Sequence, residues 1–122
     1  MTRTAGKVRK YRRVINKEVK NKIINSLIRY NPDKIGIFGS YARGETHKNS
    51  DLDILISFKK RISLLKFVQI QQELSEELGI QVDLITESSL KNPRLKSFIY
   101  RDLITIFNAI SFGTIEHRTR YM

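Results

Sequence analysis

The chain of 122 residues has the length of one domain, and its 40% hydrophobic content supports a modest core. It contains no cysteine, which excludes disulfides and cysteine-based zinc sites and fits a reducing, cytoplasmic environment. No apolar run approaches the roughly 18 residues that a membrane-spanning helix needs, so we expect no membrane association.

The formal net charge of +11 is concentrated at the front of the chain. Residues 1–34 contain 11 Lys/Arg and 2 Asp/Glu, whereas residues 35–122 contain 12 and 10. We interpret residues 1–13 as a flexible basic arm, residues 14–107 as the domain and residues 108–122 as a tail. The arm is either a solvated tail or an anchor for nucleic acid, which basic segments attract in a salt-dependent way.

The apolar pattern predicts a helix from Val14 to Tyr30. Its stripe has helical spacing and is widened by Ile24 and Ile28; it consists of Val19, Ile23, Leu27 and Tyr30. Pro32 ends the helix, because proline disfavours the α region for the residue before it. A short buried strand over residues 35–38 follows.

A glycine turn at Gly39 and Ser40 connects this strand to a short helical turn over residues 41–44. Backbone N–H groups at such a turn, together with the Ser40 hydroxyl, can bind an anion. Arg43 has two interpretations. It either neutralises phosphate charge or braces the loop, or it forms an ion pair with a nearby carboxylate.

Two carboxylates open the next strand, predicted over residues 51–58. Side chains alternate across a strand, so Asp51 and Asp53 point from the same face and are spaced to share a cation. The opposite face carries Leu52, Ile54 and Ile56, which can pack into a core. Taken alone, the Gly-Ser pair is also compatible with a plain turn, and the aspartate pair with a solvated strand end or a cap. Together, a glycine turn facing an aspartate pair can hold a nucleoside triphosphate and its magnesium.

A second helix is predicted over residues 62–78, with Gly79 as its C-cap. Its expected buried face consists of Leu64, Phe67, Val68, Leu74 and Leu78. A strand over residues 80–86 follows and places Asp83 among apolar neighbours, where an unpaired carboxylate is costly to bury. Asp83 is either ion-paired or at an edge, or it joins Asp51 and Asp53 if the helix makes the two strands parallel neighbours.

The last predicted elements are a short helix within residues 90–101 and an apolar run at residues 103–107 that is a helix or a terminal strand. The expected anchors of this helix are Leu95, Phe98 and Ile99. The fold class is therefore α/β, a small mixed sheet flanked by helices with the site at one sheet edge. A core this small favours a partner or a homo-oligomer.

The spacing G-S-x-A-R-G-x5-S-D-x-D-I over residues 39–54 resembles the signature of the polymerase-beta-like nucleotidyltransferase superfamily. The short chain resembles its minimal branch, the MNT proteins with their MntA-type antitoxins, over roughly residues 20–107. In that family the Gly-Ser pair, here Gly39 and Ser40, holds the triphosphate. The family's third acidic residue stands in a context that Asp83 matches.

This resemblance implies a nucleotidyltransferase of the polymerase-beta-like fold that transfers a nucleoside monophosphate onto an acceptor hydroxyl. The expected nucleotide is AMP, with ATP as its donor. Two Mg²⁺ ions would stabilise the attacked phosphate and the leaving pyrophosphate. We expect Asp51 and Asp53 to bridge both ions. Asp83 would bind one of them and accept the hydroxyl proton, directly or through the ion.

The family setting also implies a partner, a HEPN-domain toxin whose tyrosine the enzyme AMPylates as the antitoxin of a toxin–antitoxin pair. Two alternatives stay open. One is a non-catalytic antitoxin that neutralises its partner by binding alone. The other is an RNA-modifying nucleotidyltransferase anchored by the basic arm.

Overall fold

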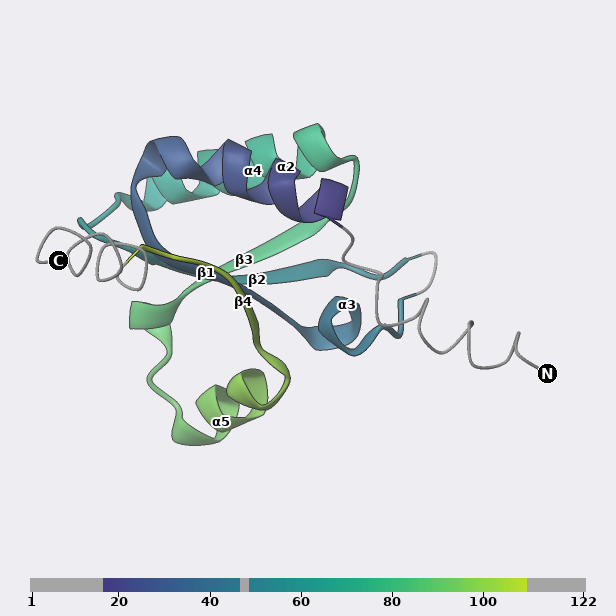
Figure 1. Cartoon of the computed structure of the whole chain (residues 1–122). Helices are drawn as coiled ribbons and strands as arrows, with labels where there is room; N and C mark the ends of the chain where they lie inside the picture. Colours follow the sequence, from purple (N-terminus) through teal and green to yellow (C-terminus); the bar gives the residue numbers. More distant parts are fainter. Residues whose placement is uncertain (1–16, 47–48, 110–122) are drawn as a thin grey trace, which may run out of the picture.

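The computed structural model describes residues 17–46 and 49–109 (Figure 1). The predicted arm at residues 1–13 lies outside the described residues, as does nearly all of the predicted tail at 108–122. The described elements run in the order α2 (Lys17–Leu27), η1 (Ile28–Tyr30), β1 (Pro32–Phe38), α3 (Gly39–Arg43), β2 (Leu52–Phe58), α4 (Leu64–Leu78), β3 (Val82–Thr86), η2 (Glu87–Ser89), α5 (Pro93–Asp102) and β4 (Ile104–Asn108). Within these ranges, no helix is long and apolar enough to cross a membrane.

The four strands form one mixed sheet in the order β3-β2-β1-β4. Helices α2 and α4 cover one face, and α3 and α5 lie on the other (Figure 1). Strands β1 and β2 are antiparallel, whereas β2 and β3 are parallel and joined by α4. The predicted α/β architecture and the parallel crossover are therefore confirmed. The run after residue 102 is the terminal strand, antiparallel to β1.

The alternation of side chains along β2 divides the core in two. Leu52, Ile54 and Ile56 are fully buried in the cluster beneath α2 and α4. Leu55, on the opposite face, packs with Ile99 of α5 in a second cluster. Because Asp53 is two residues from Leu55, it also belongs to the face that α3 and α5 occupy.

Helix α2 ends as the sequence predicts, but its last turn differs. Asn31 adopts a left-handed conformation (φ 62°), and Pro32 begins β1, three residues earlier than expected. Ile23 and Leu27 are buried, whereas Ile28 is exposed. The prediction that Ile28 widens the stripe is wrong, because the chain tightens to a 3₁₀ turn from that residue and the α-helical spacing no longer applies.

The buried face of α4 also differs from the expectation. Leu74 is buried as predicted, but Leu64 and Val68 are exposed, and Ile70 takes their place in the core. Ser63 caps the helix by accepting a hydrogen bond from the Lys66 N–H (3.1 Å). Gly79 ends the helix in the left-handed region, as predicted.

Helix α5 is held by fewer anchors than predicted. Ile99 is buried, but Leu95 and Phe98 are 47% and 53% exposed. The helix begins where Asn92 Oδ1 accepts the N–H of Arg94 (2.9 Å), and its buried residue Ile99 packs with Leu55 of β2. Because Leu95 and Phe98 are about half exposed, the prediction that they anchor the helix is wrong.

The outer edge of β3 is covered by side chains of α4. Ser75 Oγ accepts the N–H of Val82 (3.0 Å), and Gln71 Oε1 accepts the N–H of Leu84 (2.8 Å). An edge strand otherwise presents unpaired N–H groups to other chains. These two side chains therefore close the edge next to Asp83.

We expect Gln71→Ala and Ser75→Ala each to lower the free energy of unfolding by about 1 kcal/mol, because each leaves a β3 N–H without its acceptor. Urea denaturation followed by circular dichroism measures the effect. Gln72→Ala, at the exposed next position of the same helix, is the matched control and should leave the midpoint unchanged. An unchanged midpoint in Gln71→Ala would contradict the edge-covering role.

Candidate active site

Three strands bring the predicted site residues to one end of the sheet. In the strand register Phe38 of β1 lies opposite Asp53 of β2, and Asp53 lies opposite Asp83 of β3. Gly39 directly follows Phe38 and begins α3. The predicted glycine turn therefore stands beside the aspartates. Because β1 and β2 are inner strands, the site spans two inner strands and the edge strand β3 rather than one sheet edge.

Gly39 lies directly against the Asp53 carboxylate. Its φ is +76°, a conformation that side chains other than glycine rarely adopt. A Cβ at this position would overlap Asp53 Oδ2 and would come within 3.2 Å of Asp53 Cγ. Glycine is therefore required both by the turn and by the close approach of the carboxylate.

The three aspartates interact electrostatically. Asp53 is half-buried, whereas Asp51, one residue before β2, and Asp83 are exposed. Burial, followed by the charges of Asp83 and then Asp51, raises the pKa of Asp53 from 3.8 to about 6, and Arg43 opposes this rise. The three aspartates that the sequence places together are therefore close enough for Asp51 and Asp83 to repel the charge of Asp53.

The aspartates do not form a closed metal cage. Within residues 17–46 and 49–109, no three His, Cys, Asp or Glu side chains come together closely enough to hold a metal ion by themselves. The repulsion around Asp53 nevertheless fits a divalent cation, which prefers carboxylate oxygens and would neutralise this charge. Such an ion would take its other ligands from water or a substrate.

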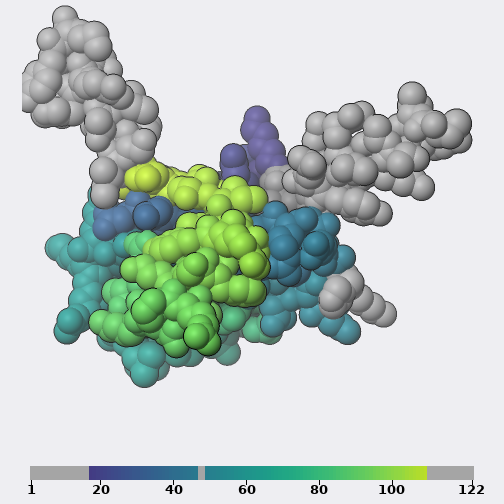
Figure 2. Space-filling model, turned by 90° about the horizontal axis from the view of Figure 1, so that it is seen from below, coloured from purple at the N-terminus to yellow at the C-terminus, as the bar shows by residue number. Residues whose placement is uncertain are grey.

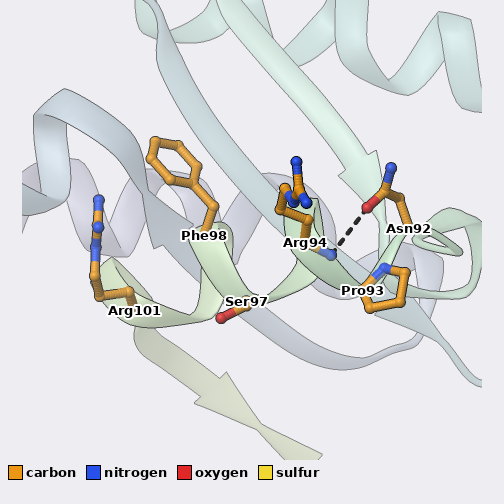
Figure 3. Close-up of a pocket in the computed structure, with 6 residues that line it drawn as sticks. All are labelled: Asn92, Pro93, Arg94, Ser97, Phe98 and Arg101. Atoms are coloured by element: carbon orange, nitrogen blue, oxygen red, sulfur yellow. Dashed lines mark hydrogen bonds between the residues drawn. The ribbon is translucent and has the colours of Figure 1, made fainter.

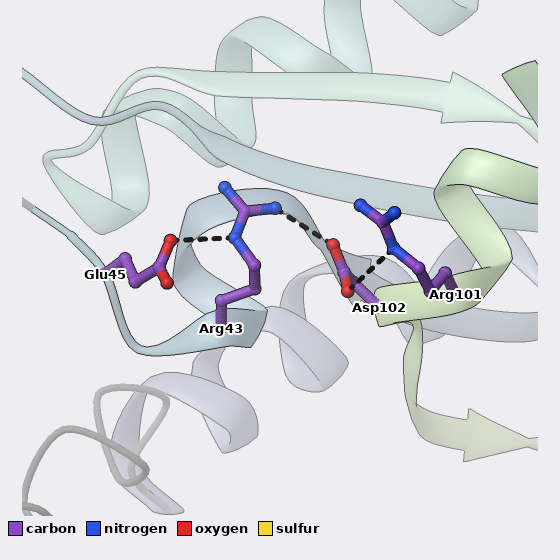
Figure 4. A network of polar contacts seen from close by, with 4 residues as sticks. All are labelled: Arg43, Glu45, Arg101 and Asp102. Atoms are coloured by element: carbon purple, nitrogen blue, oxygen red, sulfur yellow. Dashed lines mark hydrogen bonds and ion pairs between the residues drawn. The ribbon is translucent and has the colours of Figure 1, made fainter.

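Arg43 uses its side chain to connect α3 with α5 (Figure 4). Its Nε donates to Glu45 Oε1 and its Nη1 to Asp102 Oδ2, both at 2.9 Å. Arg43 therefore forms the ion pair that one of its two interpretations predicts, and its contact with a phosphate stays a prediction. Arg101 also pairs with Asp102, at 3.6 Å.

The sequence alone does not point to Glu45 or Asp102 as partners of Arg43. Asp102 is 59 residues away along the chain, so no local spacing connects the two. Only the tertiary structure brings the end of α5 against α3. Ser40 is placed at the second residue of α3, and its carbonyl accepts the N–H of Glu45 at 2.8 Å.

A pocket of about 890 Å³ runs along the exposed side of α5 (Figure 3). In it the Arg101 guanidinium lies 4.9 Å from the centre of the Phe98 ring, and Arg94 and Ser97 complete the same side of the helix. None of its lining residues is a predicted site residue. Figure 2 shows the face of the molecule on which α5 lies, with α5 and β4 beside the α3 region.

Comparison with known proteins places this geometry in a family. A family model described as nucleotidyltransferase domain matches residues 17–106. The chain is 43% identical over 104 residues to a candidate protein adenylyltransferase of Methanocaldococcus jannaschii, MJ0126, with 85% of this chain and 99% of that protein covered. It is 42% identical over 78 residues to the protein adenylyltransferase MntA of Thermococcus cleftensis, with 64% and 78% covered.

Solved structures show the same fold. A chain in a toxin–antitoxin crystal structure with AMP-PNP superposes with a TM-score of 0.67 at 23% identity, with 84% of this chain and 90% of that chain covered. A chain from the complex of the tri-AMPylated HEPN toxin of Shewanella oneidensis with its MNT antitoxin gives 0.60 at 20% identity, with 84% and 87% covered. The family model and the sequence relatives, together with this fold, show that the chain belongs to the nucleotidyltransferase-domain family, among the minimal nucleotidyltransferases that resemble MntA.

Proposed function

We propose that this nucleotidyltransferase transfers AMP from ATP to a hydroxyl group, a tyrosine hydroxyl of a HEPN-type toxin, and so acts as the antitoxin of a pair. The observation that carries the proposal is the set of three carboxylates around Asp53, held against Gly39. Its support from relatives is the MntA adenylyltransferase and the AMPylated HEPN toxin bound to an MNT antitoxin.

In this proposal the aspartates hold Mg²⁺ and Gly39 and Ser40 hold the phosphates. Asp51 and Asp53 would each contribute to the binding of both ions, and Asp83 would bind one of the two. The open arrangement suits ions that share their ligands with the triphosphate, as Mg²⁺ does with substrate phosphates. When bound, Mg²⁺ would neutralise the charge that develops on the phosphates during transfer.

The reaction joins the acceptor oxygen to the α-phosphorus and breaks the bond between that phosphorus and the α–β bridging oxygen. Pyrophosphate leaves with the electrons of that bond. We assign the proton of the attacking hydroxyl to Asp83, which lies next to Asp53 in the register and is exposed to an incoming acceptor. Gly39, which has no side chain, lets the Asp53 carboxylate lie directly against the start of α3, so a proposed metal ligand stands beside the proposed phosphate site.

Arg43 enters the proposal as a positioning residue. Its pairs with Glu45 and Asp102 hold α3, which carries Ser40, against the end of α5. Its charge also lowers the pKa of Asp53, against the effect of burial and of the other aspartates. We therefore expect it to stabilise the ionised site as well as its shape.

The test is transfer of label from α-³²P-ATP in the presence of Mg²⁺, with the HEPN-type protein encoded in the neighbouring reading frame either present or absent. We expect label on the partner, lost by at least a thousandfold in Asp51→Asn and Asp53→Asn, because the metal loses a charged ligand. Asp33→Asn, the same chemical change on β1 outside the cluster, is the matched control and should retain transfer.

The other outcomes separate the alternatives. Tight binding of the partner with no label under any metal or nucleotide would identify a non-catalytic antitoxin. Label on RNA instead of protein, lost when residues 1–13 are deleted and at high salt, would identify an RNA-modifying enzyme. Either result would overturn the proposed acceptor.

A further inference from the structure

A second pocket lies at the end of β2 and β3 opposite to the aspartates. The carboxyl ends of the two strands, the turn at residues 59–61 and the first turn of α4 enclose about 610 Å³. Phe58, Phe67 and Ile85 contribute apolar walls. Asp53 and Ser57, the first residue of β2 that lines the pocket, are four residues apart along the strand, or roughly 13 Å, so this pocket is separate from the candidate active site.

The rim of this pocket is cationic. Lys59, Lys60 and Arg61 all line it and are all exposed. In the part of the chain that the structure describes, none of the three forms an ion pair, and no Asp or Glu lines the pocket. The lining also includes the hydroxyl-bearing residues Ser57, Thr86, Ser88 and Ser89. These groups together are suited to bind carboxylates.

These cations do not serve the helix that follows them. Positive charge near a helix N-terminus is unfavourable, as is negative charge near its C-terminus. Lys59, Lys60 and Arg61 precede α4, and Glu76 and Glu77 lie in its last turn. This placement of charges does not stabilise α4. A ligand that neutralises the three cations would explain why they stand there.

Exposed aliphatic side chains continue the surface from the pocket onto α4. Leu64, which lines the pocket, is 78% exposed, Leu65 is 81% exposed and Val68 is 46% exposed. Exposed leucines beside cations are buried most readily against the apolar side chains of a protein partner, because a nucleic acid presents mainly its charged phosphate backbone to a basic surface. The combination of leucines with cations therefore favours a protein over RNA or a free nucleotide.

We propose that this basic–apolar surface, residues 57–68 together with 84–89, binds an acidic segment of the toxin that carries large apolar side chains. An amphipathic helix with Asp or Glu beside its apolar face fits both features. This inference rests on the proposed function, because it takes the toxin as the partner. It places toxin docking at the end of the sheet remote from the aspartates, so binding and transfer are separable.

The experiment measures toxin affinity by isothermal titration calorimetry and AMP transfer by α-³²P-ATP labelling. Lys59→Glu/Arg61→Glu and, separately, Leu64→Ser/Leu65→Ser should each weaken toxin binding at least tenfold. Both should leave the affinity for ATP with Mg²⁺ unchanged. Lys20→Glu/Lys22→Glu, the same charge change on the exposed side of α2, is the control and should bind as the wild type does.

Asp53→Asn completes the design, because it should bind the toxin normally and transfer nothing. Normal toxin binding by both surface variants would overturn the docking site and leave the proposed function standing. A toxin that the wild type neither binds nor labels would overturn both. Concentration-dependent dimers of the chain alone, abolished by the leucine variant, would instead identify a second copy as the occupant. RNA binding lost in the charge variant alone would identify nucleic acid.

Discussion

Asp53→Asn is expected to abolish nucleotidyl transfer and, at the same time, to raise the melting temperature of the metal-free protein. The carboxylate is half-buried and repelled by Asp83 and Asp51, so its ionised form is disfavoured in the folded chain. Asparagine removes the charge and keeps the size of the side chain. The substitution therefore removes a proposed metal ligand and, at the same time, a buried charge that the other two aspartates repel.

The pH dependence of the free energy of unfolding follows from the direction of the pKa shift of Asp53. The pKa of Asp53 is raised from 3.8 to about 6, so the folded protein holds the proton more tightly than the unfolded chain does. At pH 3 and below, which is under both pKa values, the carboxyl is protonated in both states and its burial has no electrostatic cost. As pH rises from about 4 to 6 the unfolded chain ionises first, so stability falls, and above 6 the full cost is present.

We therefore expect Asp53→Asn to exceed the wild type by about 1 kcal/mol at pH 7.5, a value reduced by the partial exposure of the carboxylate to water. That corresponds to a few degrees in melting temperature. Differential scanning calorimetry at pH 3 and pH 7.5 measures the gap in stability, which should nearly vanish at the lower pH. Mg²⁺ with a non-hydrolysable ATP analogue should stabilise the wild type more than the variant. A variant less stable than the wild type at pH 7.5 would contradict the repulsion.

The backbone arrangement of the candidate site was predictable because its signals are local. The alternation around Asp53 assigns it to one face, and a helix of this length between two strands requires a parallel crossover, which pairs Asp53 with Asp83. Gly39 ends one strand, so the antiparallel return of β2 brings it to the same place. These inferences need only periodicity, turn chemistry and chain connectivity.

The contacts that depend on tertiary packing were not predictable. The Arg43–Asp102 pair joins residues far apart in the sequence, and no spacing indicates which carboxylate Arg43 chooses. Leu64 has the spacing of a core residue, yet it lies in the first turn of α4 beyond the cover of the sheet and stays exposed. A pattern identifies a helix face, but not how far along the helix its neighbours extend.

Gly39→Ala is expected to reduce nucleotidyl transfer at least a hundredfold and to destabilise the fold. Two separate costs apply. The backbone at Gly39 has φ +76°, where an alanine is strained by about 1 kcal/mol, and the added methyl group would overlap the Asp53 carboxylate. Relief requires a shift of Asp53 or of the start of α3, and either change separates the proposed metal ligand from the proposed phosphate site.

Gly79→Ala separates these two costs. Gly79 has a similar φ of +68° at the end of α4, but a Cβ there meets no atom within 4 Å. It should therefore lose about 1 kcal/mol of stability from backbone strain alone and keep full transfer activity. Urea denaturation gives the stability of both variants, and α-³²P-ATP labelling gives their activity.

The difference between the two glycine variants is the informative quantity. If Gly39 served only the turn, both variants would lose similar stability and both would remain active. We expect instead that Gly39→Ala loses more stability and nearly all activity, since its methyl group competes for the space of the Asp53 carboxylate. We also expect the double variant Gly39→Ala/Asp53→Asn to be more stable than the sum of the two single changes in free energy of unfolding predicts. The side chain that the alanine methyl group displaces carries no charge in this variant, so its shift no longer increases the repulsion among the carboxylates.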